Sequence, residues 1–261
     1  MKALSIAATG MLAQELNVEV ISNNIANMRT TGFKRSRAEF QDLLYQNLRR
    51  PGSATSDGGA MVPAGVEIGS GVKTTATPRI MSQGSVQSTE RELDIAIRGE
   101  GFFAISLPDG RTAYTRDGSF ERDATGTIVN ANGYTVGSGI IIPENSRGVS
   151  VSAQGEVEAY LNNDVAPTTL GVIELYNFTN KVGMEAMGDN LYLETSASGT
   201  AQLGTPDDPG YGNLLQAYLE MANVNAVTQI SDLIAAQRAY EMNSRVIKAA
   251  DEMLSSTANL R

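Results

Sequence analysis

The stretch LEMANVNAVTQISDLIAAQRAYEMNSRVIKAADEML (Leu219–Leu254) decides the fold, because an apolar or small residue recurs in it every seven positions. Two turns of a slightly underwound helix take about seven residues, so this spacing keeps one narrow stripe facing a partner. The N-terminal stretch has the same spacing. The sequence therefore predicts a long helix at each end of the chain, and each helix carries an apolar seam: Leu4, Met11, Val18 and Ile25 in the first, and Leu219, Ala226, Leu233, Tyr240, Ile247 and Leu254 in the second.

Two interpretations of these seams remain open. In the first, the terminal helices form an ordinary hairpin, and the seams close on each other inside one chain. In the second, other copies of the chain complete the seams, because two helices with narrow apolar stripes bury little surface and are marginally stable alone. We favour the second interpretation and expect self-assembly to depend on Leu4, Met11, Val18, Ile25, Leu219, Leu233, Tyr240, Ile247 and Leu254.

Proline and glycine are confined to the middle of the chain. All 8 prolines, and every glycine except Gly10 and Gly32, lie between residues 51 and 212. Both residue types disfavour the interior of a helix. We therefore expect a first helix over about Lys2–Met28, a long non-helical middle and a last helix. The predicted fold class is α+β, with the terminal helices paired as a coiled coil around a mainly antiparallel β domain.

The expected domains follow from this division. Residues 1–30 and 215–261 are predicted to form a helical coiled-coil domain, residues 31–75 an extended intermediate segment, and residues 76–214 an outer β domain with a return segment. Within the intermediate segment, the apolar spacing from Ala38 to Leu48 predicts a short helix. The Gly, Ser and Pro-rich stretch Pro51–Gly71 predicts an extended or hairpin excursion, with a flexible linker as the alternative.

The segment SNNIANMRTTGFKR (Ser22–Arg35) is expected to end the first helix. Gly32 suits the left-handed conformation that often follows a helix end. Three asparagines lie within five positions, at Asn23, Asn24 and Asn27. Asparagine side chains bond to backbone groups that have no partner in a helix or sheet. We expect buried polar contacts with neighbours here, and a merely polar loop is the alternative.

The middle of the chain has strand signals at short spacing. Leu93, Ile95 and Ile97 alternate with Asp94, Ala96 and Arg98, as in a half-buried strand. Dipeptides that favour hairpin turns occur at residues 109–110, 117–118 and 132–133. Whether the strands close into a barrel or a sandwich stays open. Further strands are predicted at Thr112–Thr115, Thr127–Val129, Gly139–Ile142, Val149–Val151, Glu156–Leu161 and Gly171–Phe178.

Composition excludes several classes of function. The chain of 261 residues has no His, Cys or Trp, so it has no Ser-His-Asp or Cys-His nucleophile, no thiolate or imidazole zinc site and no disulfide. The net charge of −9 argues against nucleic-acid binding, which needs surplus Lys and Arg. No run of 18 apolar residues is present, and we expect neither a membrane span nor a cleaved signal peptide. We also expect no metal and no cofactor.

An enzyme that works with carboxylates alone is the class that composition leaves open. A glycosidase needs only a pair of Asp or Glu side chains, and Asp94, Glu100 and Asp117 are the candidates. Such sites usually have aromatic side chains that stack on sugars, and aromatic residues make up only 6% of this chain. We therefore expect no enzyme activity, and we keep a secreted β-domain enzyme or adhesin as the alternative from another class.

Four motifs lie in order along nearly the whole chain: SNNIANMRTTGFKR (Ser22–Arg35), LDIAIRGEGFF (Leu93–Phe103), AYTRDGSF (Ala113–Phe120) and AQRAYEMNSRVIKAADEML (Ala236–Leu254). Together they resemble the rod and hook family of bacterial flagellar axial proteins. AEFQDLLYQ (Ala38–Gln46) and DNLYLET (Asp189–Thr195) point to the distal rod within that family, and a proximal rod or hook subunit is the alternative. The family motif at the end of the first helix falls on Asn24, Ala26, Asn27, Thr31, Gly32, Phe33 and Lys34.

The resemblance implies a structural role. Members of the family leave the cell through the export channel of the flagellum, without a cleaved signal, and stack helically into a hollow tube that spans the periplasm. It implies that the terminal helices line this tube, that the β domain faces outward, and that residues 44–71 are associated with a stiff rod. The implied partners are further copies of the chain, proximal rod proteins, the hook protein, the surrounding P and L rings and the export apparatus.

Overall fold

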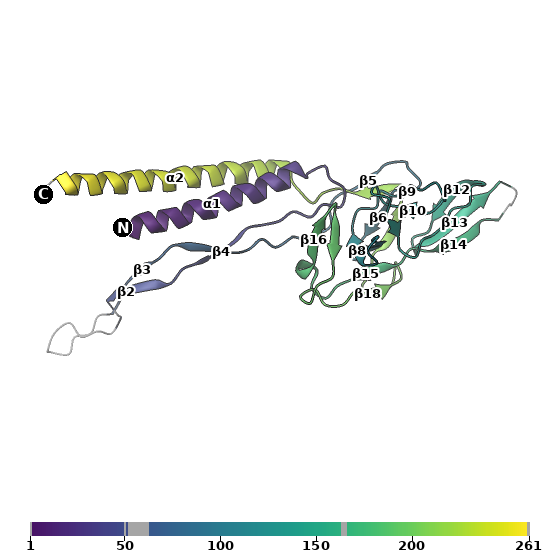
Figure 1. Cartoon of the computed structure of the whole chain (residues 1–261), viewed down its shortest axis with the longest axis horizontal. Coiled ribbons are helices and arrows are strands. Elements are labelled where there is room, and N and C mark those ends of the chain that lie inside the picture. Colours follow the sequence, from purple (N-terminus) through teal and green to yellow (C-terminus); the bar gives the residue numbers. More distant parts are fainter. Residues whose placement is uncertain (1, 50, 52–62, 163–165, 260–261) are drawn as a thin grey trace. The chain divides into compact units, whose positions relative to one another are not determined.

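The computed structural model describes residues 2–49, 51, 63–162 and 166–259, and the chain divides into two compact units. Residues Met1–Ile25, Ser36–Pro78 and Asn225–Arg261 form the first, which we call the helical unit. Residues Ala26–Arg35 and Arg79–Val224 form the second, which we call the β unit. Figure 1 shows the elements of both along the chain.

Two antiparallel helices, α1 (Lys2–Ala26) and α2 (Ala226–Asn259), lie side by side in the helical unit (Figure 1). Near one end of the pair, the Asn24 amide bonds to Gln229. Fourteen residues along each helix, a Cβ atom at Gly10 would lie 2.8 Å from Asn243 Nδ2, so the Asn243 side chain packs directly against the backbone of Gly10. The buried residues of the pair are mostly small or polar: Ala7, Ala13, Ile21 and Asn24 in α1, and Gln229, Ala236 and Ala250 in α2.

The helices are shorter than predicted. The first ends at Ala26 rather than at Met28. The second begins at Ala226, where the Asn225 side chain accepts a hydrogen bond from Thr228 N and caps the helix. The prediction that Leu219 belongs to this helix is wrong, because Leu219 pairs with Gln87 between two strands. The seven-residue step from Leu219 to the helix is therefore not a helical repeat.

The described strands of the helical unit form a two-stranded ribbon: β1 (Glu39–Asp42), β2 (Tyr45–Arg49), β3 (Val66–Gly69) and β4 (Val72–Ala76). Strand β1 pairs with β4, and β2 with β3. The short helix predicted from Ala38 to Leu48 is therefore wrong, because pairing with a later segment overrides the local spacing. Residues 52–62 of the Pro51–Gly71 excursion lie outside the described residues.

All strand pairs that the structure describes in the β unit are antiparallel. One sheet has seven strands in the order β16-β17-β8-β7-β11-β10-β9, another has the order β12-β13-β14, and β15-β18, β19-β6 and β20-β5 form pairs. A 3₁₀ turn, η1, covers Lys181–Gly183. The strands are β5 (Val86–Ser88), β6 (Ile95–Arg98), β7 (Phe103–Ser106), β8 (Thr112–Thr115), β9 (Glu121–Arg122), β10 (Ile128–Val129), β11 (Thr135–Val136), β12 (Ser146–Val151), β13 (Glu156–Leu161), β14 (Thr168–Val172), β15 (Leu175–Asn177), β16 (Glu185–Gly188), β17 (Leu191–Leu193), β18 (Gln202–Gly204), β19 (Asn213–Gln216) and β20 (Tyr218–Glu220).

Most predicted strands are present. Thr112–Thr115 and Glu156–Leu161 match β8 and β13 residue for residue. Residues 139–142 form no strand and contribute only an isolated bridge from Ile141 to Thr127. Strand β6 is buried on both faces rather than on one, since Ala96 is as inaccessible as Ile95.

Two hydrophobic clusters lie in the β unit. The larger one contains Phe103 and Phe120, whose rings meet edge to face at 5.1 Å. The smaller one contains Tyr114 and Phe178, at 4.8 Å in the same geometry. Phe102 belongs to the smaller cluster, although it is next to Phe103 in sequence. Side chains of neighbouring strand residues point to opposite faces of a strand, so Phe102 and Phe103 pack into different clusters.

The turn dipeptides serve different purposes. Asp109-Gly110 connects the paired strands β7 and β8, and Asn132-Gly133 connects β10 and β11, as predicted. Asp117-Gly118 was expected to be a hairpin turn, but it joins β8 to β9, which do not pair in the described sheet. A Cβ atom at Gly118 would lie about 1.7 Å from the carbonyl oxygen of Ile95, so glycine is needed there for close backbone approach.

We predict that Gly118→Ala lowers the free energy of unfolding of the β unit by about 1–3 kcal/mol or more, because the added methyl group forces the backbone away from Ile95. Urea unfolding followed by near-ultraviolet circular dichroism measures this change. The control is Gly148→Ala, where the new methyl group would lie at an ordinary 3.5 Å from Glu92. Equal stabilities for the two variants would contradict this account of Gly118.

Candidate functional site

The chain passes between the two units four times, after residues 25, 35, 78 and 224. Within the β unit, these four passages start or end in three segments. Segment 26–35 is joined to the helical unit at both ends, while segments 79–84 and 220–224 are each joined to it at one end. Polar contacts join these three segments in one place. We call this place the junction cluster, and it consists of Lys34, Arg35, Ile80, Ser82, Gly84, Arg116, Glu220 and Asn223.

Gly32 sets the position of the first segment. Its φ of +67° is in the left-handed region, as expected after a helix end. Its N–H donates a hydrogen bond of 2.8 Å to the backbone oxygen of Glu220. A Cβ atom here would lie 2.7 Å from Asp117 N. Glycine therefore serves two needs at this position, the turn and the close approach.

The carboxylate of Glu220 is at the centre of the cluster. Its Oε1 accepts hydrogen bonds from Lys34 Nζ at 2.6 Å and from Gly84 N at 2.8 Å. Its Oε2 lies 3.7 Å from Arg116 Nε. The side chains of the two cations are 1% and 3% exposed, and that of Glu220 is 0% exposed. One buried carboxylate thus faces two buried cations.

Both cations also donate hydrogen bonds to backbone oxygens. Lys34 Nζ donates to Ser82 O at 2.9 Å, and Arg116 Nη2 donates to Gly99 O at 2.7 Å. Burial lowers the pKa of Lys34 below the ordinary lysine value, the attraction of Glu220 opposes this decrease, and Arg116 adds to it. Burial also lowers the pKa of Arg116, again against the attraction of Glu220.

Asn223 completes the cluster. Its Oδ1 accepts a hydrogen bond from Arg35 N at 2.8 Å, and its Nδ2 donates to Ile80 O at 2.7 Å and to Ser82 O at 3.0 Å. Ile80 N in turn donates to Arg35 O at 2.8 Å. One amide side chain therefore connects all three segments, and these three bonds satisfy backbone groups.

The helical unit has a smaller polar contact of its own at Asn24. The Asn24 amide donates to Ser36 O at 2.8 Å and to Gln229 Oε1 at 2.9 Å, and it accepts from Ser36 N at 2.9 Å. Asn24 and Gln229 are buried. The expected buried contact of an asparagine is therefore present, but its partners belong to the same chain. Asn23 is exposed and Asn27 is half-buried.

The predicted assembly residues are only partly covered in the single chain. Tyr240 and Leu254 are exposed, while the other helical members of the seam, Leu4, Met11, Val18, Ile25, Leu233 and Ile247, are half-buried. Val18 and Tyr240 line a groove of about 460 Å³ between α1 and α2, together with Glu15, Glu19, Gln237 and Glu241. The buried residues of α2 are Gln229, Ala236 and Ala250, which lie beside the predicted seam and not in it.

The motif residues are divided between the two units. Asn24 lies in the helical unit, and Ala26, Asn27, Thr31, Gly32, Phe33 and Lys34 lie in the β unit. Sequence reasoning found Lys34 and Gly32 but missed Glu220, Asn223 and Ser82. No local pattern could have identified Glu220, because it is 186 residues away from Lys34.

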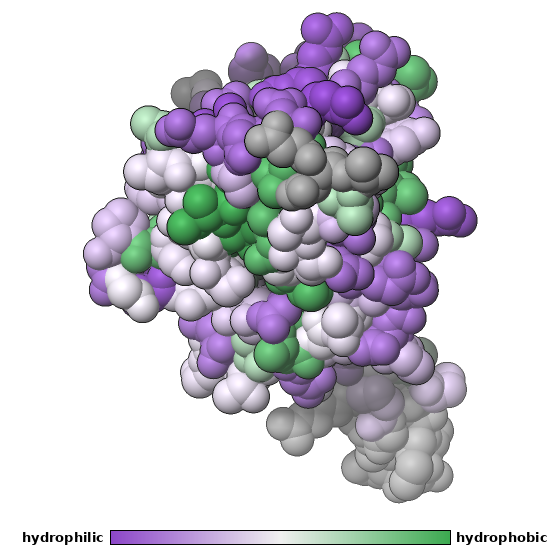
Figure 2. All heavy atoms as spheres, turned by 90° about the vertical axis from the view of Figure 1, so that its right-hand side faces the viewer, coloured by the Kyte–Doolittle hydropathy of each residue, from purple (hydrophilic) through white to green (hydrophobic). Residues whose placement is uncertain are grey.

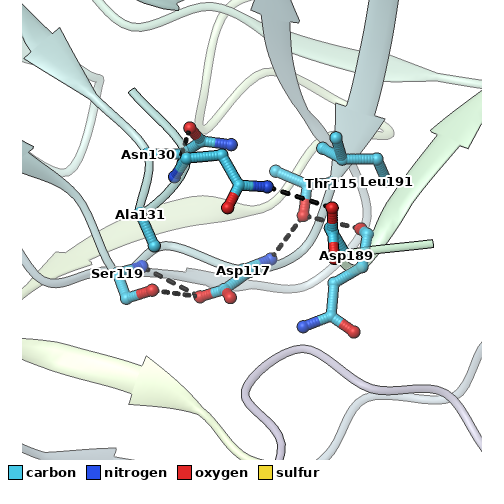
Figure 3. Close-up of a pocket in the computed structure, with 9 residues that line it drawn as sticks. Thr115, Asp117, Ser119, Asn130, Ala131, Asp189 and Leu191 are labelled. Carbon is cyan, nitrogen blue, oxygen red and sulfur yellow. Dashed lines mark hydrogen bonds between the residues drawn. The ribbon is translucent and has the colours of Figure 1, made fainter. Parts of the chain in front are cut away.

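A separate polar cavity of about 200 Å³ lies in the β unit (Figure 3). Asp117 accepts hydrogen bonds from the backbone and hydroxyl of Ser119, and Asn132 donates to Asp189 across the cavity. The other lining residues are Thr115, Asn130, Ala131, Asn190 and Leu191. Two carboxylates and several amides give this cavity an acidic, hydrogen-bonding surface.

The glycosidase candidates do not come together in this cavity. Asp117 lines it, but Asp94 and Glu100 do not. Asp94 is buried, and Glu100 forms an ion pair with Lys181. Among the described residues, no group of three or more His, Cys, Asp or Glu side chains is arranged to hold a metal ion.

We predict that Asn223→Ala lowers the free energy of unfolding of the β unit by about 1–3 kcal/mol, because it leaves Arg35 N–H and the Ile80 carbonyl without this partner. Thermal unfolding measures the change. The matched control is Asn132→Ala, which removes an exposed side-chain bond to Asp189 and should have little effect. If the two variants are equally stable, Asn223 does not hold the junction cluster together.

Comparison with protein families gives three matches along the chain. Residues 4–34 match the flagella basal body rod protein family, and residues 96–159 match the D1 domain of the flagellar hook protein FlgE/F/G. Residues 215–260 match the C-terminal domain of the flagellar basal body rod FlgEFG proteins. The first of these matches contains Lys34, and the last contains Glu220 and Asn223.

Relatives named flagellar basal-body rod protein FlgG are similar over the whole length. The one from Caulobacter vibrioides is 55% identical over 261 residues, which is 100% of both chains. The one from Agrobacterium fabrum is 50% identical over 98% of this chain and 97% of its own. The one from Bacillus subtilis is 37% identical over 100% of this chain and 99% of its own. The chain therefore belongs to the FlgG family of flagellar basal-body rod proteins.

Proposed function

We propose that this chain is a structural subunit of the distal rod, and that its copies stack into a hollow, stiff shaft that transmits motor torque to the hook. The observation that carries this proposal is the similarity to FlgG proteins over the entire chain. The family is a structural one, located in the basal-body rod. A contact between copies that does not close on itself grows a helical filament, which is the geometry a shaft needs.

The exposed apolar surface of α2 supports self-assembly through the terminal helices. Val227 is 76% exposed and Met242 is 60% exposed, on a helix that already packs against α1. Apolar residues at helical spacing form a stripe that another helix can cover. We propose that neighbouring copies cover this stripe and the half-buried seam in a coiled-coil arrangement. The exposed large apolar residues of α2 are Val227, Ile230, Ile234, Tyr240, Met242, Val246, Met253 and Leu254.

The β2-β3 ribbon and the β unit offer further surface. Leu44 is 87% exposed, and Tyr45, Leu48, Val66 and Ile68 on the ribbon are exposed as well. Figure 2 views the end of the β unit with β12, β13 and β14, and hydrophobic side chains gather among hydrophilic ones on that face. We propose that the ribbon stiffens the shaft by contacting another copy and that the β unit faces outward.

The further partners are proposals of the same kind: proximal rod proteins, the hook protein, the surrounding P and L rings and the export apparatus. The proposed location is the part of the rod in the periplasm, reached by flagellar export without a cleaved signal peptide. In the described part of the chain, neither helix combines the length and the apolar character that crossing a bilayer requires.

Electron microscopy of basal bodies tests the proposal. We expect the outer part of the rod to be missing from cells that lack this chain and to return when the chain is expressed again. Intact rods in the deletion strain would refute the proposed function.

A substitution in the seam tests the mode of assembly. We predict that Leu233→Asp abolishes rod formation and leaves the β unit folded, because a charge in the seam between helices has no partner. The control is Lys248→Asp at an exposed position of α2. Basal bodies and near-ultraviolet circular dichroism report assembly and folding separately, and normal rods with Leu233→Asp would disprove the role of the seam.

A further inference from the structure

The charges of the junction cluster do not balance. Arg116 and Glu220 already form a pair of one cation and one anion, although their side-chain atoms are 3.7 Å apart. Lys34 adds a second buried cation. Glu100 also attracts both cations, but its side chain is 56% exposed and is paired with Lys181. The β unit thus contains more buried positive charge than Glu220 can neutralise.

This arrangement is a poor way to gain stability. Removing a lysine ammonium from water is unfavourable, and its attraction to a carboxylate often only offsets that loss. Burial is the largest cause of the lowered pKa of Lys34, so its surroundings disfavour the charged ammonium group. A hydrophobic side chain of similar length at position 34 would leave Arg116 paired with Glu220. The stability of the β unit therefore does not explain a lysine here.

The hydrogen bonds of Lys34 suggest a different role. Its Nζ connects Ser82 O to Glu220 Oε1, and the same oxygen of Glu220 holds Gly84 N. Lys34 thus fixes segment 26–35 against segments 79–84 and 220–224. Segment 26–35 continues into the helical unit at both of its ends, so it contains two of the four passages between the units.

We propose that Lys34 is a positioning residue, which fixes segment 26–35 in place for rod assembly and contributes little to the stability of the β unit. This proposal rests on the proposed function as a rod subunit. It predicts that the stability of the β unit and the formation of rods respond differently to the loss of Lys34. A residue that only stabilises the fold would change both together.

The test uses the full chain with Lys34→Met. We expect its melting temperature to stay within about 4 °C of that of the unmodified chain. Hydrogen exchange should become at least about tenfold faster at the amides of Gly32 and Arg35, because both are held within the segment that Lys34 fixes. Exchange at Ile95, which donates to Gly118 O in the core, should not change. Cells with this variant should form fewer complete rods.

Two further variants make the result specific. Glu220→Gln leaves two buried cations without their shared anion, so we expect the β unit to unfold. Arg111→Gln breaks an ion pair with Asp109 in the same unit, where both side chains are exposed, and should change neither exchange nor rods.

Three results would overturn the proposal: a fall of more than about 4 °C in the melting temperature of Lys34→Met, unchanged exchange at Gly32 and Arg35, or normal rods. Failure of the proposed function itself is distinguishable, because intact rods would then be present in the strain that lacks the whole chain.

Discussion

The buried carboxylate of Glu220 is the group on which the junction cluster depends. It bonds to Lys34 and Gly84 and lies beside Arg116, while the backbone of the same residue receives the N–H of Gly32. These contacts gather, within the β unit, the segments through which the chain leaves for the helical unit. Because Glu220 is fully buried and faces two cations, few other residues could replace it without leaving a charge unpaired.

The two units differ in the source of their stability. The β unit has two closed aromatic and aliphatic clusters, so its stability comes from its own core. The helical unit buries mainly alanines and one polar pair, and it leaves large apolar side chains of α2 exposed. Such a unit gains most of its stability when other helices cover it. A subunit of a filament is expected to divide in this way between a self-sufficient domain and an assembly-dependent one.

The sequence predicted those features that depend on local chemistry. The absence of proline and most glycines from the chain ends predicted both helices, and β-type runs predicted β8 and β13. The predicted helix from Ala38 to Leu48 failed, because its residues pair with a segment beyond residue 62. The seven-residue spacing was extended one step too far, to Leu219, because strand pairing decides the structure there.

The candidate site shows the same limit. Lys34 and Gly32 lie within a motif and could be singled out, but Glu220 and Asn223 are brought to them only by the folded chain. The buried residues of α2 are Gln229, Ala236 and Ala250, which are small or polar rather than large and apolar. Small and polar residues allow the helices to approach, and most of the apolar seam beside them is half-buried in the single chain.

The most direct test of the account is a density map of the assembled rod at a resolution that shows side chains. We predict that Lys34, Ser82, Glu220 and Asn223 of one subunit are in contact with each other, and that exposed side chains of α2 are covered by helices of other subunits. If Lys34 instead contacts an acidic side chain of another copy, or if α2 remains uncovered, the central claim is wrong.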